Sequence, residues 1–265
     1  MRQPEKDVSL NKAHYFFQFV DLFMSFVKKA LLPLILLTQS SFVFAGIQIG
    51  ATRVIYEEQR QDSVIKISNP DKSNNYLIQS WVESLSDTPS ATDAIKKKSK
   101  SKVKSPFIVT PPLFSLSAGE ENVLRIIHNG AALPADHESV FWLNIKSIPE
   151  TEKKESNTMV FSVKSTLKLI YRPEALSGDK ATRAYQKITF KKQGNQLVAT
   201  NPTPYYLTFS SLKVDGNELV IKNKAMLSPA SSLTYDLGNS SSAATVSWTT
   251  LGDQGQTTPA ESSKL

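Results

Sequence analysis

The chain has 265 residues, of which 40% are hydrophobic and 21% are charged, and this composition excludes wholesale disorder and collagen-like repeats. It contains no cysteine, which excludes disulfide scaffolds, cysteine-ligated metal centres and thiol nucleophiles together. Its three histidines are too few for a histidine-rich metal site. The formal net charge of +7 suits an acidic partner, or contributes to solubility alone.

Residues 1–45 have the pattern of a secretory signal peptide. The basic pair Lys28-Lys29 precedes an apolar run over 30–37, and small residues spaced for signal peptidase end the segment at Ala45. The apolar run is too short for a membrane span of about 20 residues. We expect cleavage after Ala45, with Met24 as a second potential start of translation. An uncleaved anchor that also uses the apolar residues before Lys28 is the alternative.

Short runs of alternating apolar and polar residues follow, separated by turn residues, and they predict an all-β fold. In the longest run, Met159 to Tyr171, odd-numbered residues are mostly apolar and even-numbered residues are mostly polar, which predicts one buried face and one exposed face. No stretch after residue 45 has a convincing helical period. We expect strands within 47–56, 65–67, 76–82, 107–109, 123–127, 140–148, 159–171, 188–190, 197–200, 206–209, 219–221, 233–235 and 244–250.

The strands divide into two groups at the Arg172-Pro173 stop. Seven strands over 46–173 predict an immunoglobulin-like sandwich, and 174–265 predicts a second, smaller all-β domain. The polar tail after Gly255 is expected to fray. The lysine-rich segment 96–104 is either a solvated connector between two strands or a contact for an anionic surface.

One segment resembles a known family signature. Residues 133–149 read LPADHESVFWLNIKSIP, which is similar to the signature of the PapD-like family of periplasmic pilus-assembly chaperones. His137 departs from it, because the family usually has Lys, Arg, Glu or Gln there. Further blocks resemble the family in the same order, at 52–56, 106–112, 168–173 and 201–206.

The resemblance implies a fold and a function. It implies two immunoglobulin-like domains set at an angle, and a chaperone that lends its seventh strand to pilin subunits, which lack their own last strand. The implied partners are pilin subunits, a tip adhesin and an outer-membrane usher, in the periplasm of a Gram-negative bacterium. No nucleic acid, ATP, metal or cofactor is implied, nor stable membrane insertion after signal cleavage. The short segment 150–157 resembles the short-loop branch of the family.

The resemblance also implies binding residues. Arg53 and Lys168 match two cations that anchor the C-terminal carboxylate of the subunit. Met159, Phe161 and Val163 match the side chains that the donated strand supplies. From the alternating pattern alone, this row would more often pack within the chaperone's own sandwich.

Three further charged residues, Glu138, Arg172 and Asp253, match a family ion network that fixes the angle between the two domains. The alternative for them is three unrelated surface charges.

Two other classes of protein remain open from the sequence. An enzyme is disfavoured because no nucleophile elbow, Walker loop or zinc-protease motif occurs. An exported immunoglobulin-like structural subunit or adhesin is the other alternative. It would lack the two anchoring cations, and a pilin would carry a donor extension longer than residues 46–52.

Overall fold

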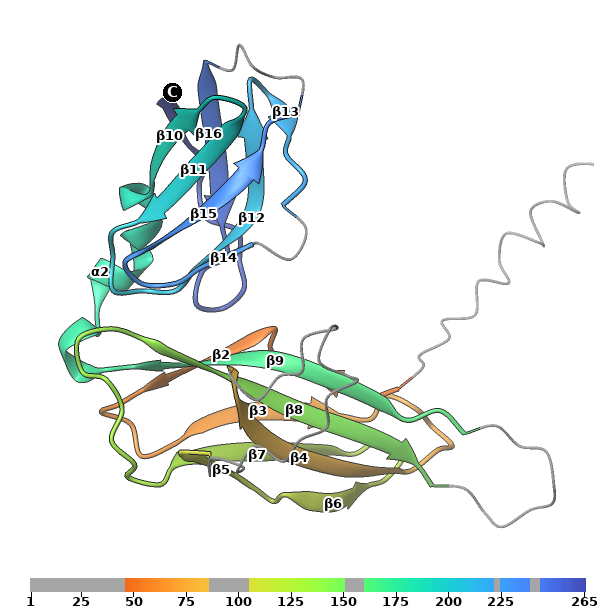
Figure 1. The fold of residues 1–265 in the computed structure, drawn as a ribbon. Helices are drawn as coiled ribbons and strands as arrows, with labels where there is room; N and C mark the ends of the chain where they lie inside the picture. Colours follow the sequence, from red (N-terminus) through yellow and green to blue (C-terminus); the bar gives the residue numbers. More distant parts are fainter. Residues whose placement is uncertain (1–45, 86–104, 151–159, 222–224, 239–243) are drawn as a thin grey trace, which may run out of the picture. The chain divides into compact units, whose positions relative to one another are not determined.

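The computed structural model describes residues 46–85, 105–150, 160–221, 225–238 and 244–265. The predicted signal peptide, the lysine-rich segment 96–104 and Met159 lie outside these ranges. The regular structure of the described chain is mostly β-strand, in four sheets that form two sandwiches (Figure 1). The all-β prediction is therefore confirmed, and the boundary at residue 173 stays a prediction.

The first sandwich holds nine strands in two sheets. One sheet has the order β1-β3-β7-β5, with β1 Gln48–Ile49, β3 Ser63–Ser68, β7 Glu121–His128 and β5 Phe107–Thr110. The other has the order β2-β9-β8-β4-β6, with β2 Arg53–Glu57, β9 Val163–Arg172, β8 Ser139–Pro149, β4 Tyr76–Ser84 and β6 Leu113–Leu116.

Period-two alternation builds the core of this sandwich. Ile65 and Ile67 on β3 are buried, whereas Lys66 between them is exposed. On β9 the buried residues Leu167 and Leu169 belong to the same core, as the sequence predicted. Burying such an aliphatic side chain contributes roughly 1.5–3 kcal/mol, so the alternation decides which face of each strand turns inward.

The second sandwich has its own core. Its smaller sheet has the order β10-β11-β15, with β10 Thr189–Gln193, β11 Gln196–Asn201 and β15 Ser231–Asp236. The larger has the order β13-β12-β16-β17, and β14 also pairs with β12; the bounds are β12 Leu207–Val214, β13 Asn217–Glu218, β14 Met226–Leu227, β16 Thr245–Thr250 and β17 Glu261–Lys264. A bulge between Phe209 and Ser211 shifts the pattern of β12, so that Phe209 and Leu212 both face inward.

Between the two sandwiches the chain forms three short helical turns, η3 Glu174–Leu176, α2 Asp179–Thr182 and η4 Ala184–Lys187.

The chain changes sheets between β1 and β2. β1 pairs antiparallel with β3, whereas β2 pairs in parallel with β9, where Arg53 lies opposite Lys168. Gly50 lies at the crossing and donates its N–H to Lys66 O at 2.9 Å. A Cβ at Gly50 would lie 3.3 Å from that carbonyl oxygen, so the close approach favours glycine.

The strands differ from the sequence prediction at several places, and β6 and β14 were not predicted. The alternating run from Met159 predicted an earlier start, but β9 begins at Val163, which pairs with Ser147 near the end of β8. The tail after Gly255 does not simply fray, because β17 pairs with β16. The short strand expected at 219–221 is wrong, since its place is taken by β13 at Asn217–Glu218.

Candidate functional site

One edge of β9 is covered along only half of its length. β2 pairs with the second half, from Lys168 to Arg172, and β8 pairs with Val163 to Tyr171 on the other side. Within the described ranges, residues 163–167 therefore have a strand neighbour on one side only. An open strand edge presents unpaired N–H and C=O groups and is normally protected by charge, proline or a covering segment.

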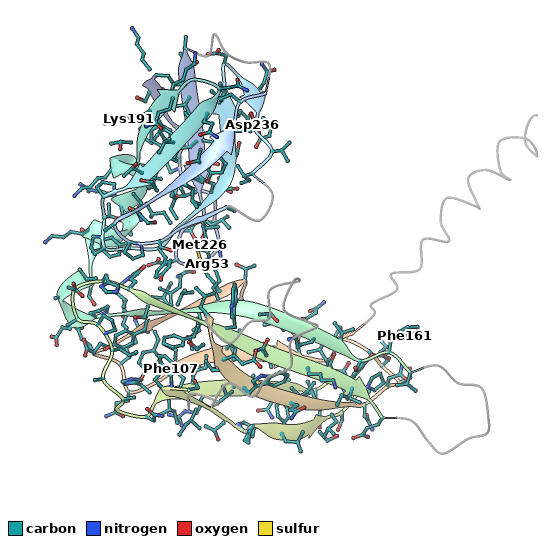
Figure 2. The ribbon with its side chains drawn as sticks, in the orientation of Figure 1. Arg53, Phe107, Phe161, Lys191, Met226 and Asp236 are labelled. Atoms are coloured by element: carbon teal, nitrogen blue, oxygen red, sulfur yellow. The ribbon has the colours of Figure 1, made fainter. Side chains whose placement is uncertain are left out.

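Apolar side chains are exposed where this open edge begins. Phe161 is 70% exposed and Val163 57% exposed, and Val160 beside them is also exposed. Figure 2 shows Phe161 at the end of the first sandwich remote from Arg53. An open edge with exposed apolar residues is a hazard for aggregation unless a partner uses it. The structure thus places two of the three predicted donor residues in the open, while Met159 lies outside the described residues.

Arg53 and Lys168 meet where the open edge ends. They are direct neighbours across the parallel β2–β9 pair, so the structure brings the two predicted cations together. Both also contact the second sandwich. Lys168 Nζ donates a hydrogen bond to Thr208 Oγ1 at 3.1 Å, and an Nη of Arg53 donates to Leu251 O at 3.3 Å.

Burial makes this cation pair electrostatically unfavourable. Burial, with a further contribution from the charge of Arg53, lowers the pKa of Lys168 to about 8. Burial also lowers the pKa of the Arg53 guanidinium, although the charges of Asp253 and Glu138 oppose the shift. The buried Nε of Arg53 has no hydrogen-bond acceptor in the described part of the chain. Such a site favours an anion that accepts several hydrogen bonds, and a carboxylate meets that need.

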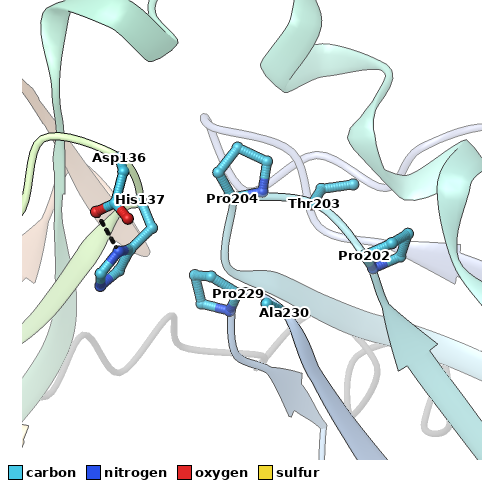
Figure 3. A pocket seen from close by; sticks show the side chains of 7 residues that line it. All are labelled: Asp136, His137, Pro202, Thr203, Pro204, Pro229 and Ala230. Atoms are coloured by element: carbon cyan, nitrogen blue, oxygen red, sulfur yellow. Dashed lines mark hydrogen bonds and ion pairs between the residues drawn. The ribbon is translucent and has the colours of Figure 1, made fainter.

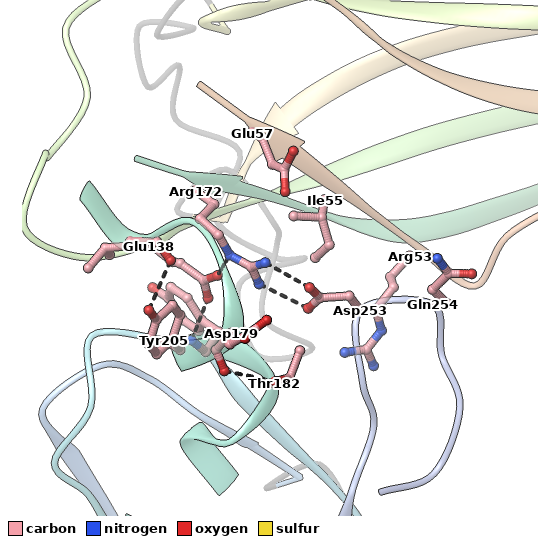
Figure 4. Close-up of polar contacts among 12 residues, drawn as sticks. Arg53, Ile55, Glu57, Glu138, Arg172, Asp179, Thr182, Tyr205, Asp253 and Gln254 are labelled. Carbon is pink, nitrogen blue, oxygen red and sulfur yellow. Dashed lines mark hydrogen bonds and ion pairs between the residues drawn. The ribbon is translucent and has the colours of Figure 1, made fainter. Parts of the chain in front are cut away.

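The structure brings Glu138, Arg172 and Asp253 together. Arg172 Nε donates to Glu138 Oε1 at 2.7 Å, and its two Nη atoms donate to the carboxylate of Asp253 at 2.7 and 2.9 Å (Figure 4). Glu138 is 1% exposed, and its other oxygen accepts the backbone N–H of Tyr206 at 2.7 Å. Its own N–H donates to Pro204 O. These contacts join residues of the first sandwich to residues of the second.

The electrostatics of the network keep Arg172 charged. Burial opposes its ionised form, but the hydrogen bond with Asp253 and the charges of both carboxylates raise the pKa of Arg172 above its ordinary value. Burial raises the pKa of Glu138, and the charge of Arg172 is the first of the effects that oppose this shift. Both carboxylate oxygens of Glu138 accept a hydrogen bond, which is the condition under which a buried ion pair is tolerated.

His137, where the sequence departs from the family pattern, lies at the mouth of a pocket of about 340 Å³ (Figure 3). Its Nδ1 lies 2.7 Å from Asp136 Oδ1, and the side chains of both are exposed. The opposite wall consists of the turns at Pro202–Pro204 and Pro229-Ala230. His137 precedes Glu138 but does not take part in the ion network.

Sequence reasoning missed two groups at the site. Thr208, which accepts the hydrogen bond from Lys168, has no distinguishing pattern in the sequence beyond its place in a strand. The carbonyl of Leu251 is a backbone group and carries no signal at all. Neither could be assigned without knowing how the two sandwiches meet.

The chain matches known proteins along nearly all of its described length. A family model described as "Pili and flagellar-assembly chaperone, PapD N-terminal domain" matches residues 46–177, and "Pili assembly chaperone PapD, C-terminal domain" matches residues 183–262. The chaperone protein FimC of Escherichia coli K12 is 38% identical over 220 residues, which cover 81% of this chain and 83% of FimC.

Two solved structures are also similar. The E. coli chaperone DraB superposes with a TM-score of 0.68 at 32% identity, over 83% of this chain and 96% of DraB. A chain in the structure of the Salmonella enterica SafA pilin in complex with the SafB chaperone superposes with a TM-score of 0.69 at 27% identity, over 85% of this chain and 99% of that chain. Among the residues described for the present chain, none belongs to a helix long and apolar enough to cross a bilayer.

Proposed function

The chain belongs to the PapD family of pilus-assembly chaperones, and we propose that it captures pilin subunits by lending them the open edge of β9. One observation carries this proposal: the cations Arg53 and Lys168 lie at the point on β9 where its pairing with β2 begins, next to the open edge. The Salmonella structure that resembles this chain contains a pilin in complex with a chaperone, which supports the same type of partner.

The direction of the added strand follows from the position of the two cations. A strand along residues 163–167 brings its C-terminus to Arg53 and Lys168 only if it runs parallel to β9, as β2 does. Its C-terminal carboxylate then meets Arg53 and Lys168. Two charge-assisted donors fix the position of that carboxylate, and this position sets the register of the whole strand.

The exposed apolar side chains of the donor segment supply hydrophobic contact. Val163 lies on the same face of β9 as Leu167 and Leu169, and Phe161 falls on that face if the strand extends by two residues. Backbone hydrogen bonds tolerate many sequences, whereas the alternate side chains fill the groove of an incomplete subunit. We propose that Met159, Phe161 and Val163 are these donor side chains.

The remaining parts of the proposal concern location and delivery. The residue pattern of 1–45 supports export to the periplasm, and a pilus chaperone works where its subunits arrive unfolded. We propose that the chain hands its subunits, including a tip adhesin, to an outer-membrane usher. We also propose that the ion network of Glu138, Arg172 and Asp253 fixes the angle between the two domains. That angle would keep Thr208 and Leu251 in contact with the two cations.

Co-purification from periplasm tests the proposal. The chain is co-expressed with a pilin, and the pilin recovered in a one-to-one complex is measured for the unaltered chain and for Arg53→Ala with Lys168→Ala. The cost of leaving a desolvated carboxylate without its partners is about 3–5 kcal/mol, so recovery should fall by at least about a hundredfold.

Lys66→Ala and Lys213→Ala serve as matched controls, because both side chains are exposed and form ion pairs with Glu121 and Glu218, outside β2 and β9. Both control variants should recover pilin normally. Normal recovery with Arg53 and Lys168 both changed would show that no carboxylate is anchored there.

A further inference from the structure

The ammonium group of Lys168 is held by a neutral oxygen. Nζ donates to Thr208 Oγ1 at 3.1 Å, across the junction between β9 and β12. Thr208 is 6% exposed and lies opposite Met226 in the β12–β14 pair, so its hydroxyl has a fixed place. Lys168 therefore reaches a defined acceptor instead of moving freely in solvent.

No carboxylate among the residues that the structure describes acts on the charge of Lys168. The charge that acts on Lys168 is the positive charge of Arg53 on β2, and Asp253 and Glu138 act on Arg53. Trp142 on β8 is its antiparallel cross-strand neighbour. A carboxylate in place of Thr208 would neutralise the ammonium and compete with an incoming carboxylate. An apolar residue would leave a half-buried ammonium without an acceptor.

We propose that Thr208 is a positioning residue for subunit capture, whose hydroxyl orients the Lys168 ammonium so that its other N–H groups meet the C-terminal carboxylate of the added strand. This inference rests on the proposed function, which assigns that carboxylate to Arg53 and Lys168. Through Thr208, the second domain thus contributes a hydrogen-bond acceptor to the site that binds the subunit's C-terminal carboxylate. An ammonium has three donors, so one bond to Thr208 leaves two for the ligand.

The test uses a synthetic strand peptide of alternating apolar and polar residues, with a free C-terminal carboxylate or with an amide in its place. Its affinity is measured over a pH range that spans the pKa of Lys168, which burial lowers to about 8. Thr208→Val keeps the shape of the side chain but removes the acceptor. It should weaken binding of the carboxylate peptide about tenfold, because a hydrogen bond to a charged group is lost.

The pH profile separates positioning from a structural role. Without its acceptor the ammonium is harder to keep charged, so the midpoint of binding should move to lower pH in Thr208→Val by about half a unit or more. Thr208→Ser should restore both affinity and midpoint. Thr200→Val is the matched control, because it removes a hydroxyl that bonds Ser232 between β11 and β15, away from the site. It should leave both readouts unchanged.

The outcomes are distinct. If Thr208→Val binds the carboxylate peptide as the unaltered chain does, with the same midpoint, the positioning role is overturned. If Thr208→Ser fails to restore the midpoint in a chain that melts normally, the role is overturned as well. If the unaltered chain binds the amidated peptide as tightly as the carboxylate peptide, the proposed function itself fails, whatever Thr208 does.

Discussion

Phe161→Asp should abolish most subunit capture while leaving the free chaperone as stable as before. Phe161 is 70% exposed and lies outside any strand in the unbound chain, so its replacement removes almost no contact from the folded protein. Burial of a phenylalanine side chain in the subunit groove is worth roughly 1.5–3 kcal/mol. Loss of that contact alone predicts about a tenfold to a hundredfold weaker complex. A desolvated aspartate without a partner weakens it further.

Ser162→Asp provides the matched control. It introduces the same charge one residue away, at a side chain that is also exposed. If the donor strand extends through this segment, Ser162 points to the face opposite Phe161, and the added charge stays in solvent. Pilin recovered from periplasm is measured for both variants, after thermal unfolding shows that both melt like the parent. Equal losses with the two variants would refute the donated register.

Other predictions concern the ions and the processing of the chain. Because burial lowers the pKa of Lys168 to about 8, the cost of its charge in the free chaperone is fully present below that pH and disappears as pH rises toward the unfolded value of 10.5. Lys168→Met should therefore raise the melting temperature at pH 7 by about 2–4 °C, with the gain fading between about pH 8 and pH 10.5, while subunit capture is lost. Glu138→Gln should lower the free energy of unfolding by about 3–5 kcal/mol, and Asp253→Asn by less, because Glu138 is 1% exposed and the Asp253 side chain is 42% exposed; urea unfolding of both variants would show whether this order holds. N-terminal sequencing of the periplasmic protein should start near Gly46, and an intact Met1 or Met24 in a membrane fraction would instead indicate an uncleaved anchor.

Alternation along single strands predicted much of the fold. Ile65 and Ile67 were expected on the inner face of one strand and Leu167 and Leu169 on that of another, and all four are buried. This works because side chains in a strand alternate between faces and each buried aliphatic group contributes free energy. The Arg172-Pro173 stop also marks the end of β9 at Arg172, because proline has no N–H to continue the ladder.

Strand ends depend on neighbours that the sequence does not reveal. The alternating pattern continues back to Met159, yet β9 begins at Val163, where its pairing with β8 begins near the end of that strand. The tail is polar and was expected to fray, but β17 is an exposed edge strand whose backbone pairs with β16 without burying its side chains. In both cases backbone pairing set the strand bounds and the side-chain pattern did not.

The residues of the site also depend on contacts between segments far apart in the sequence, which their local sequence does not reveal. Arg53 and Lys168 were assigned together only through the family resemblance, because nothing in their local sequence pairs them. Their parallel pairing appears once β2 is placed on β9. Thr208 remained unassigned, since one threonine in a strand resembles any other until the second sandwich is placed against the first.

Amide hydrogen exchange on the chaperone, alone and with a bound pilin, tests the central claim that the open edge of β9 is the surface lent to the subunit. An added strand must protect amides in residues 163–167, which among the described residues have a strand neighbour on one side only, and in 161–162 if the donated strand extends to them. The β1-β3-β7-β5 sheet should change little. The proposed function predicts slowed exchange concentrated in 161–167. Unchanged exchange there in a stable complex, with protection elsewhere on the molecule, would contradict strand donation by this edge.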